Sequence, residues 1–254
     1  HGEFVNGEMI GNFTVKFPNG DIYIGPLKDY LPSDVGEYYY SNNAVYIGEF
    51  NGYDREGYGI LFYGDNGKAH QGLWNDNKIS NGAFCTIDSS GVLDTLYFGD
   101  FNDEGEPHGY GTMYLESLKK IRNFDNEGLV SYRGEFKNFM PDGYGIGIFE
   151  DVDIFSKSDF NIIYDGYWKN GKRHGKGYMS RLLNSEYRFH KGKFINDEFE
   201  GKSIRITQHN NNNYYELSEG RTDELNSHSM WMKPGKNDSK YLSYTNFNDI
   251  QDYI

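Results

Sequence analysis

Three kinds of residue in this chain have types and spacings that could do chemistry: Gly-x-Gly turns, an acidic loop, and histidines with one cysteine. The Gly-x-Gly at residues 57–59 recurs along the chain and could cradle a phosphate. A dinucleotide-binding loop, however, must lie between a strand and a helix, and a P-loop requires Gly-Lys-Ser/Thr. Neither context appears in the sequence, so we predict that these glycines are structural.

The candidate metal ligands and nucleophiles also fail to match the known patterns of metal sites and catalytic sites. Residues 100–105 begin like a calcium-binding loop, but Gly111 stands where the bidentate Glu should be. The seven histidines lack the short spacing of a zinc site, and His108 and His174 each precede a repeated glycine. Cys85 is the single cysteine, which rules out an internal disulfide or a Cys-based zinc site, and we expect it to be a small buried residue.

Signatures of the common catalytic machineries are also missing from the sequence. No Ser-His-Asp arrangement, nucleophile elbow or kinase signature is readable. Acidic residues are plentiful, so a catalytic carboxylate pair stays open at this point. We predict that the chain is not an enzyme and has no catalytic residues, no cofactor and no metal.

The feature that must position all these residues is a phrase that recurs eight times. It consists of an aromatic residue or His, any residue, Gly, any residue and a large apolar residue, usually followed by a polar turn and Gly-x-Gly. Successive key glycines are separated by 23, 23, 24, 27, 35, 32 and 26 residues. A period of about 20–50 residues indicates an array of small units that bury a shared core only by stacking. The key glycines are Gly2, Gly25, Gly48, Gly72, Gly99, Gly134, Gly166 and Gly192.

Each unit has the pattern of a β-hairpin. Period-2 alternation places Tyr46, Gly48 and Phe50 on one face of a strand, and residues 57–63 form the return strand. Because glycine weakens a strand, we expect rings of neighbouring strands to lie across these glycines. The remaining rings would line a groove for a partner peptide or helix, or would only cover neighbouring glycines. The predicted groove anchors, all at the fifth position of the phrase, are Phe50, Trp74, Phe101, Phe136, Trp168 and Phe194.

The charge of the chain is strongly acidic but uneven. A net charge of −13 argues against nucleic acid as a partner. Residues 1–100 hold 5 Lys/Arg and 14 Asp/Glu, whereas residues 164–193 hold 8 Lys/Arg and 2 Asp/Glu. The basic stretch could bind an anionic lipid headgroup or be a solvated charged face. The candidate anion-binding residues are Lys169, Lys172, Arg173 and Lys176.

The repeats define the expected domain organisation. We predict a repeat array over residues 1–203 and an atypical C-terminal cap or extension over 204–254, with an amphipathic helix suggested by the apolar spacing in 241–254. Two insertions, residues 115–130 and 150–161, are either partner-side loops or tolerated surface loops. The chain opens inside a repeat, so its true N-terminus could be missing, and an uncapped edge strand at Gly2 could pair with a second copy in a homodimer.

The repeated phrase closely resembles the MORN (membrane occupation and recognition nexus) repeat. Residues 164–178 match the family consensus nearly throughout, and the units at Tyr46, Tyr97 and Tyr132 match well. The units at 23, 70 and 190 match less well, since His replaces the aromatic residue in the last two. The resemblance covers roughly residues 1–203. It implies an all-β fold: an elongated, single-layer, twisted antiparallel sheet of about eight consecutive hairpins, with a C-terminal capping tail.

The resemblance also implies a class of function. MORN-repeat proteins act as scaffolds or adaptors that bind protein partners at cytoskeletal or membrane-associated assemblies. Others carry the array as an accessory module of a larger enzyme, such as a SET-type lysine methyltransferase or a phosphatidylinositol phosphate kinase. No apolar run approaches the ~18 residues that a membrane-spanning helix needs. We therefore expect a cytoplasmic protein, peripheral to a membrane or the cytoskeleton, and keep phosphoinositide or membrane-surface binding as an alternative.

Overall fold

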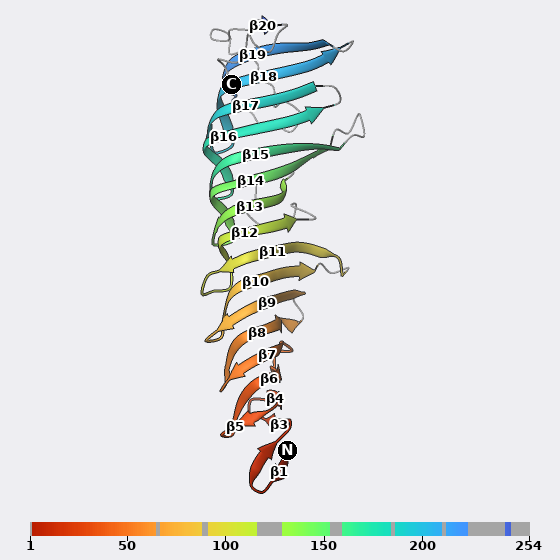
Figure 1. Ribbon diagram of the computed structural model, residues 1–254, viewed down its shortest axis with the longest axis vertical. Coiled ribbons are helices and arrows are strands. Elements are labelled where there is room, and N and C mark those ends of the chain that lie inside the picture. Colours follow the sequence, from red (N-terminus) through yellow and green to blue (C-terminus); the bar gives the residue numbers. More distant parts are fainter. Residues whose placement is uncertain are drawn as a thin grey trace. The chain divides into compact units, whose positions relative to one another are not determined.

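The computed structural model describes residues 2–64, 67–87, 91–115, 129–152, 159–183, 186–209, 212–222 and 242–244. These residues form β-strands joined by turns, with no α-helix among them. The chain divides into two compact units, His1–Glu116 and Ser117–Ile254. Figure 1 labels the strands of both units. Within each unit, most consecutive strands pair antiparallel, which confirms the predicted all-β, single-layer sheet of hairpins.

Unit 1 contains a small separate hairpin and one larger sheet. The hairpin is β1–β2, and in the sheet each strand from β6 to β11 pairs with the next one along the chain. The strands of unit 1 are β1 (Glu3–Val5), β2 (Glu8–Ile10), β3 (Phe13–Lys16), β4 (Ile22–Gly25), β5 (Leu27–Lys28), β6 (Leu31–Tyr39), β7 (Val45–Asn51), β8 (Asp54–Phe62), β9 (Lys68–Asn75), β10 (Lys78–Ile87), β11 (Leu93–Phe101) and β12 (Pro107–Leu115).

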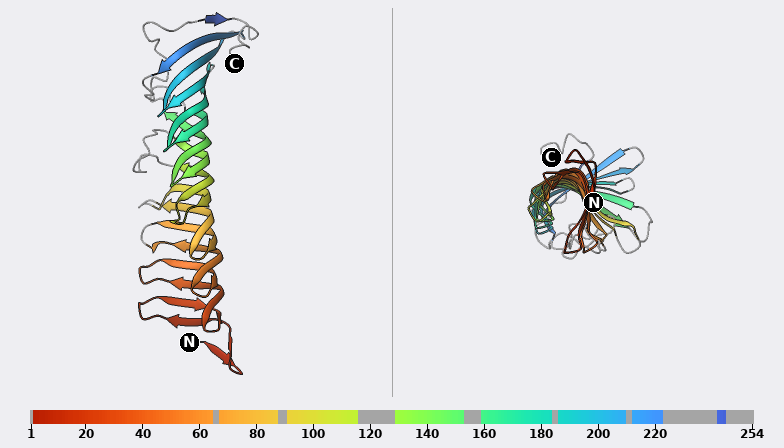
Figure 2. Two further views of the ribbon diagram at one scale, coloured as in Figure 1. Left: turned by 90° about the vertical axis from the view of Figure 1, so that its left-hand side faces the viewer. Right: turned by 90° about the horizontal axis from the view of Figure 1, so that it is seen from below.

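In unit 2, too, each strand pairs antiparallel with the next one along the chain, and most of the strands are longer than those of unit 1. Its strands are β13 (Leu129–Lys137), β14 (Met140–Val152), β15 (Asp159–Lys169), β16 (Lys172–Leu183), β17 (Glu186–Ile195), β18 (Glu198–His209), β19 (Asn212–Thr222) and β20 (Leu242–Tyr244). In both units the strands bend noticeably along their length (Figure 2).

A column of glycines crosses each sheet in register. Gly48 of β7 faces Gly59 of β8, and a Cβ added to Gly48 would lie 2.5 Å from the Cα of Gly59. The same pairing links every neighbouring strand of the column, so that one face carries a strip without side chains. The column consists of Gly36, Gly48, Gly59, Gly72, Gly82, Gly99 and Gly111 in unit 1 and of Gly134, Gly145, Gly166, Gly177, Gly192, Gly201 and Gly220 in unit 2.

A buried tyrosine fills this strip in most hairpins. Tyr46 lies over both Gly48 and Gly59, since a Cβ on Gly59 would come within 2.2 Å of the Tyr46 hydroxyl. Residues i and i+2 share a face and lie about 7 Å apart along a strand, which matches the length of a tyrosine ring. The expectation that a neighbouring strand supplies the ring is therefore confirmed for Gly59 of β8, which Tyr46 of β7 covers. It is wrong for Gly48, because that glycine is covered by a ring of its own strand, two residues earlier.

Each of these tyrosines also makes a local hydrogen bond within its own hairpin. The hydroxyl donates to the backbone carbonyl three residues later, for example from Tyr97 to Asp100 at 2.8 Å. Burial raises the pKa of the Tyr97 hydroxyl, so the group stays protonated and remains a donor. The same bond is made by Tyr23 to Pro26 (2.8 Å), Tyr46 to Glu49 (3.2 Å), Tyr132 to Glu135 (2.9 Å) and Tyr164 to Tyr167 (2.9 Å).

Beyond residue 203 the sheet continues. Strand β18 runs across that position, and Gly201 still faces Gly220 of β19. The helix suggested for residues 241–254 is wrong at 242–244, which form strand β20 paired with β19, and its other positions lie outside the described residues. The strand edge of β19 offers unpaired backbone groups, and pairing with them prevails over a weak helical spacing. Of the two insertions, 115–130 lies largely outside the described residues, whereas 150–152 and 159–161 extend the β14–β15 hairpin.

Candidate functional site

The predicted groove anchors lie in the core, on the face that also carries the glycine column; we call this the inner face. Phe50, Trp74, Phe136, Trp168 and Phe194 are each at most 6% exposed, and Phe101 is half-buried. Their rings are therefore occupied by contacts within the chain rather than open to a partner.

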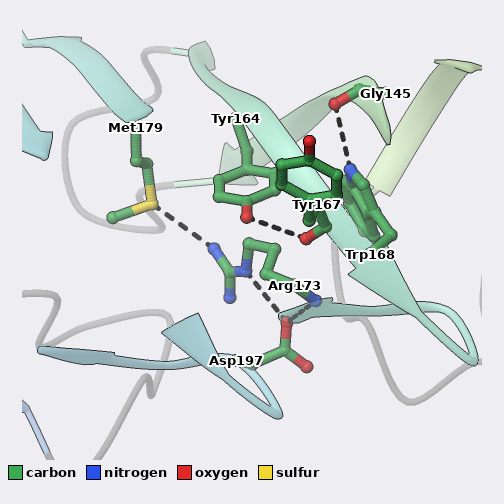
Figure 3. Close-up of polar contacts among 7 residues, drawn as sticks. All are labelled: Gly145, Tyr164, Tyr167, Trp168, Arg173, Met179 and Asp197. Atoms are coloured by element: carbon green, nitrogen blue, oxygen red, sulfur yellow. Dashed lines mark hydrogen bonds and ion pairs between the residues drawn. The ribbon is translucent and has the colours of Figure 1, made fainter. Parts of the chain in front are cut away.

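Trp168 shows what these fifth-position rings do. Its ring packs edge-to-face on Tyr164 of its own repeat (5.2 Å between centroids) and on Tyr132 of the preceding repeat (5.1 Å). Its Nε1 donates to the carbonyl of Gly145 at 3.1 Å (Figure 3). A Cβ on Gly147 of the neighbouring strand would collide with the Trp168 ring, so the Trp168 ring covers a glycine of the adjacent strand. Trp168 thus joins one repeat to the next.

The basic candidate residues are not equivalent. Lys169 and Lys176 are exposed and Lys172 is half-buried, but the Arg173 side chain is only 8% exposed. One carboxylate oxygen of Asp197 accepts from both the backbone N and the Nε of Arg173, each at 2.9 Å (Figure 3). The guanidinium also lies over aromatic rings. Because Arg173 is neutralised within the chain, it is not available to a lipid headgroup.

The opposite face, which we call the outer face, carries the open aromatic side chains. Tyr58 is 71% exposed and Tyr110 is 54% exposed, and each is the middle residue of a Gly-x-Gly. These tyrosines were missed by the sequence analysis. Period-2 alternation was the signal that could have found them, because the residue before an inner-face glycine such as Gly59 or Gly111 must point outward.

In unit 1 these side chains form a patch that we call the outer apolar face. Cross-strand pairing sets Tyr58 beside Leu73 and Ile47 beside Ile60. Apolar side chains this exposed, on neighbouring strands of one sheet face, are typical of a contact surface rather than of a solvated sheet. The exposed members of the outer apolar face are Val35, Ile47, Tyr58, Leu73, Phe98 and Tyr110.

Carboxylates are built into the outer apolar face. Glu49 Oε1 accepts from the backbone N of Tyr58 at 2.8 Å, and Asp100 Oδ2 accepts from the backbone N of Tyr110 at 3.2 Å. Each of these tyrosines is therefore held next to a negative charge. The surface presented by unit 1 combines apolar area with acidic groups.

Unit 2 has an outer face of different charge. Tyr144 packs edge-to-face on Tyr167 and donates its hydroxyl to the Asp165 carboxylate, which raises the pKa of Tyr144. The Tyr178 ring lies 5.8 Å from the ammonium of Lys191. Tyrosines are again exposed, and a basic side chain accompanies one of them, Tyr178.

The described part of the chain assembles no metal centre. No group of three His, Cys, Asp or Glu side chains gathers there in a way that could hold a metal ion. In the loop that resembles a calcium site, the Asn102 side-chain oxygen accepts from the backbone N of Glu104 and Glu106, as a turn requires. Cys85 is half-buried.

Comparisons with known proteins do not identify the chain. A scan against protein-family models and a search of curated proteins both found no match. Among the residues that the structure describes, there is also no helix long and apolar enough to cross a membrane.

Proposed function

We propose that this chain is a non-catalytic scaffold of the MORN-repeat type that binds protein partners through the outer apolar face of unit 1. The observation that supports this most directly is the row of exposed Tyr58, Leu73 and Tyr110 on a sheet whose other face is already closed by its own aromatic core. Tyrosine anchors supply much of the affinity at protein interfaces. The resemblance of the repeated phrase to the MORN repeat favours the same class of function, at a cytoskeletal or membrane-associated assembly.

The charge of the surface indicates the chemistry of the partner. Glu49 and Asp100 hold the exposed tyrosines, and the first 100 residues carry 14 acidic against 5 basic side chains. An apolar segment flanked by Lys or Arg would complement this surface, and opposite charge would speed its association. We therefore propose a basic, amphipathic peptide segment as the part of the partner that is bound.

The test is affinity capture from cells followed by direct titration. The bait is the full chain, compared with a double variant Tyr58→Ser/Tyr110→Ser and with a control variant, Tyr53→Ser. Tyr53 is 52% exposed but lies in the β7–β8 turn, so its loss leaves the outer apolar face intact. We expect the double variant to bind recovered proteins about tenfold or more weakly, and the control to bind like wild type.

Two further readouts make the test decisive. Circular dichroism and thermal unfolding establish that the double variant is folded. Binding that weakens with added salt supports the charge complementarity, because screening reduces exposed electrostatic attraction. Binding that is unchanged in the folded double variant would exclude the outer apolar face as the contact surface.

A further inference from the structure

Two arginines occupy equivalent positions in the two units. Arg55 pairs in register with the fifth-position Phe50, as Arg173 does with Trp168. The backbone N of Arg55 donates to the side-chain oxygen of Asn77 at 2.9 Å, just as that of Arg173 donates to Asp197. Both guanidinium groups lie over rings, with Arg55 centred 4.5 Å above Trp74.

The two arginines differ in their counter-charge. Asp197 neutralises Arg173 through its Nε, whereas Asn77 presents a neutral amide to Arg55. The Nη2 of Arg55 donates to the backbone carbonyl of Asn77 at 2.6 Å, but its Nε is buried without a hydrogen-bond partner. Arg55 as a whole is half-buried, and a partly desolvated cation is stabilised by a partner of opposite charge.

The carboxylates closest in sequence to Arg55 are committed elsewhere. Asp54 accepts from the Asn77 side-chain amide, and Glu56 accepts from the backbone N of Asp76. No carboxylate of the described residues forms an ion pair with Arg55. The cation of unit 1 therefore lacks the internal counter-ion that its equivalent in unit 2 has.

The surroundings of Arg55 are suited to a small anion. The half-buried Tyr40 and Tyr63 lie near enough to Arg55 for its charge to oppose the rise that burial causes in their pKa. His70, 5% exposed, packs against Tyr63 with 5.4 Å between ring centroids. The Nε2 of His70 lies 2.9 Å from the Gly105 carbonyl, and its buried Nδ1 has no partner. Two unpaired buried nitrogens thus belong to one cluster on the inner face.

We infer that Arg55 is the centre of an anion-binding site on the inner face of unit 1, which takes a carboxylate from outside the chain. The carboxylate occupies the role that Asp197 plays for Arg173, and the planar guanidinium recognises it through paired N–H donors. Its source is either a free small carboxylate or the Asp or Glu side chain of a partner. The site is separate from the outer apolar face, so it stands or falls independently of the proposed function.

The first arm of the test measures thermal unfolding of the full chain in sodium acetate against sodium chloride at equal ionic strength. We expect acetate to raise the midpoint of wild type by about 2–4 °C at saturation, because it binds only the folded state. In Arg55→Met the two salts should give the same midpoint. Equal shifts in wild type and in Arg55→Met, or no acetate-specific shift in wild type, would overturn the inference.

A second variant keeps the test valid if Arg55→Met folds poorly. The double variant Asp54→Asn/Asn77→Asp installs the carboxylate that unit 2 already uses and exchanges the amide and the carboxylate that now face each other, so no two carboxylates come into contact. It should raise the midpoint in chloride and abolish the response to acetate. A full acetate response retained in this double variant would refute the site.

The second arm distinguishes the sources of the carboxylate. It compares acetate with a capped peptide Ala-Ala-Glu-Ala-Ala and with the same peptide carrying Gln. A response to the Glu peptide at lower concentration than to acetate assigns the site to a partner side chain. A response to acetate alone assigns it to a free carboxylate, and stabilisation by the Gln peptide equal to that by the Glu peptide contradicts anion recognition.

Discussion

Acidification should destabilise unit 1 through His70, which takes the place of the tyrosine that covers the glycines in other repeats. Burial lowers the pKa of His70 to about 4, from 6.5 for an exposed histidine, and the charges of Arg55 and Lys68 add to the lowering. The hydrogen bond to the Gly105 carbonyl acts in the opposite direction. Protonation would place an N–H at Nδ1, where no acceptor is available.

The sign and size of the effect follow from these two pKa values. The unfolded chain binds the proton more readily than the folded chain, so the stability contributed by neutral His70 is complete above pH 6.5 and is lost as the pH falls towards 4. Linkage gives a loss of about 2 kcal/mol in the free energy of unfolding at pH 5, and of about 3 kcal/mol at pH 4.

The assay is urea unfolding followed by circular dichroism at pH 7.5 and pH 5. His70→Phe keeps a ring but removes the titrating group, so its stability should change about 2 kcal/mol less between the two pH values than that of wild type. Tyr97→Phe is the matched control, because it loses the corresponding buried hydrogen bond to Asp100 without removing a histidine. Tyr97→Phe should be less stable than wild type by about 1 kcal/mol at both pH values. If wild type and His70→Phe lose equal stability on acidification, His70 is not the group responsible.

Three substitutions test the packing of the repeats, each by urea unfolding. Trp168→Ala should cost about 3–5 kcal/mol, because the ring joins two repeats; a cost below about 1 kcal/mol would mean that the ring is not a core element. Gly59→Ala should cost about 1–3 kcal/mol through collision with Tyr46, and an unchanged midpoint would contradict the tyrosine cover. Asp197→Asn should cost about 2 kcal/mol, since Arg173 then keeps a buried charge without a counter-ion; no loss would show that the ion pair contributes little.

Much of the fold could be predicted from the order of residues in one repeat. Alternation of Tyr46, Gly48 and Phe50 is a strand pattern. Because this pattern recurs at short intervals, it indicates consecutive hairpins that stack on one another. The short C-terminal strand β20 could not be predicted in this way. Its backbone partners belong to β19, some 30 residues earlier, and local spacing carries no information about them.

The rings predicted to anchor a partner lie in the core of the sheet. Phe50 and Trp168 have the side chains expected of partner anchors, but tyrosines of their own and the preceding repeats enclose them. Arg173 has the charge expected of a lipid contact, but Asp197, 24 residues away, neutralises it. In both cases the decisive neighbour comes from another hairpin.

By itself, the sequence determined that the chain is a series of β-hairpins and that the second glycine and the middle residue of each Gly-x-Gly lie on opposite faces. Those properties depend only on the two-residue period of a strand. The tertiary structure decided which face closes into a core, because that depends on how rings of successive repeats meet across the glycine column. It also decided that Arg173 has an internal counter-ion and Arg55 has none, since only the pairing of one hairpin with the next places Asp197 or Asn77 beside the guanidinium.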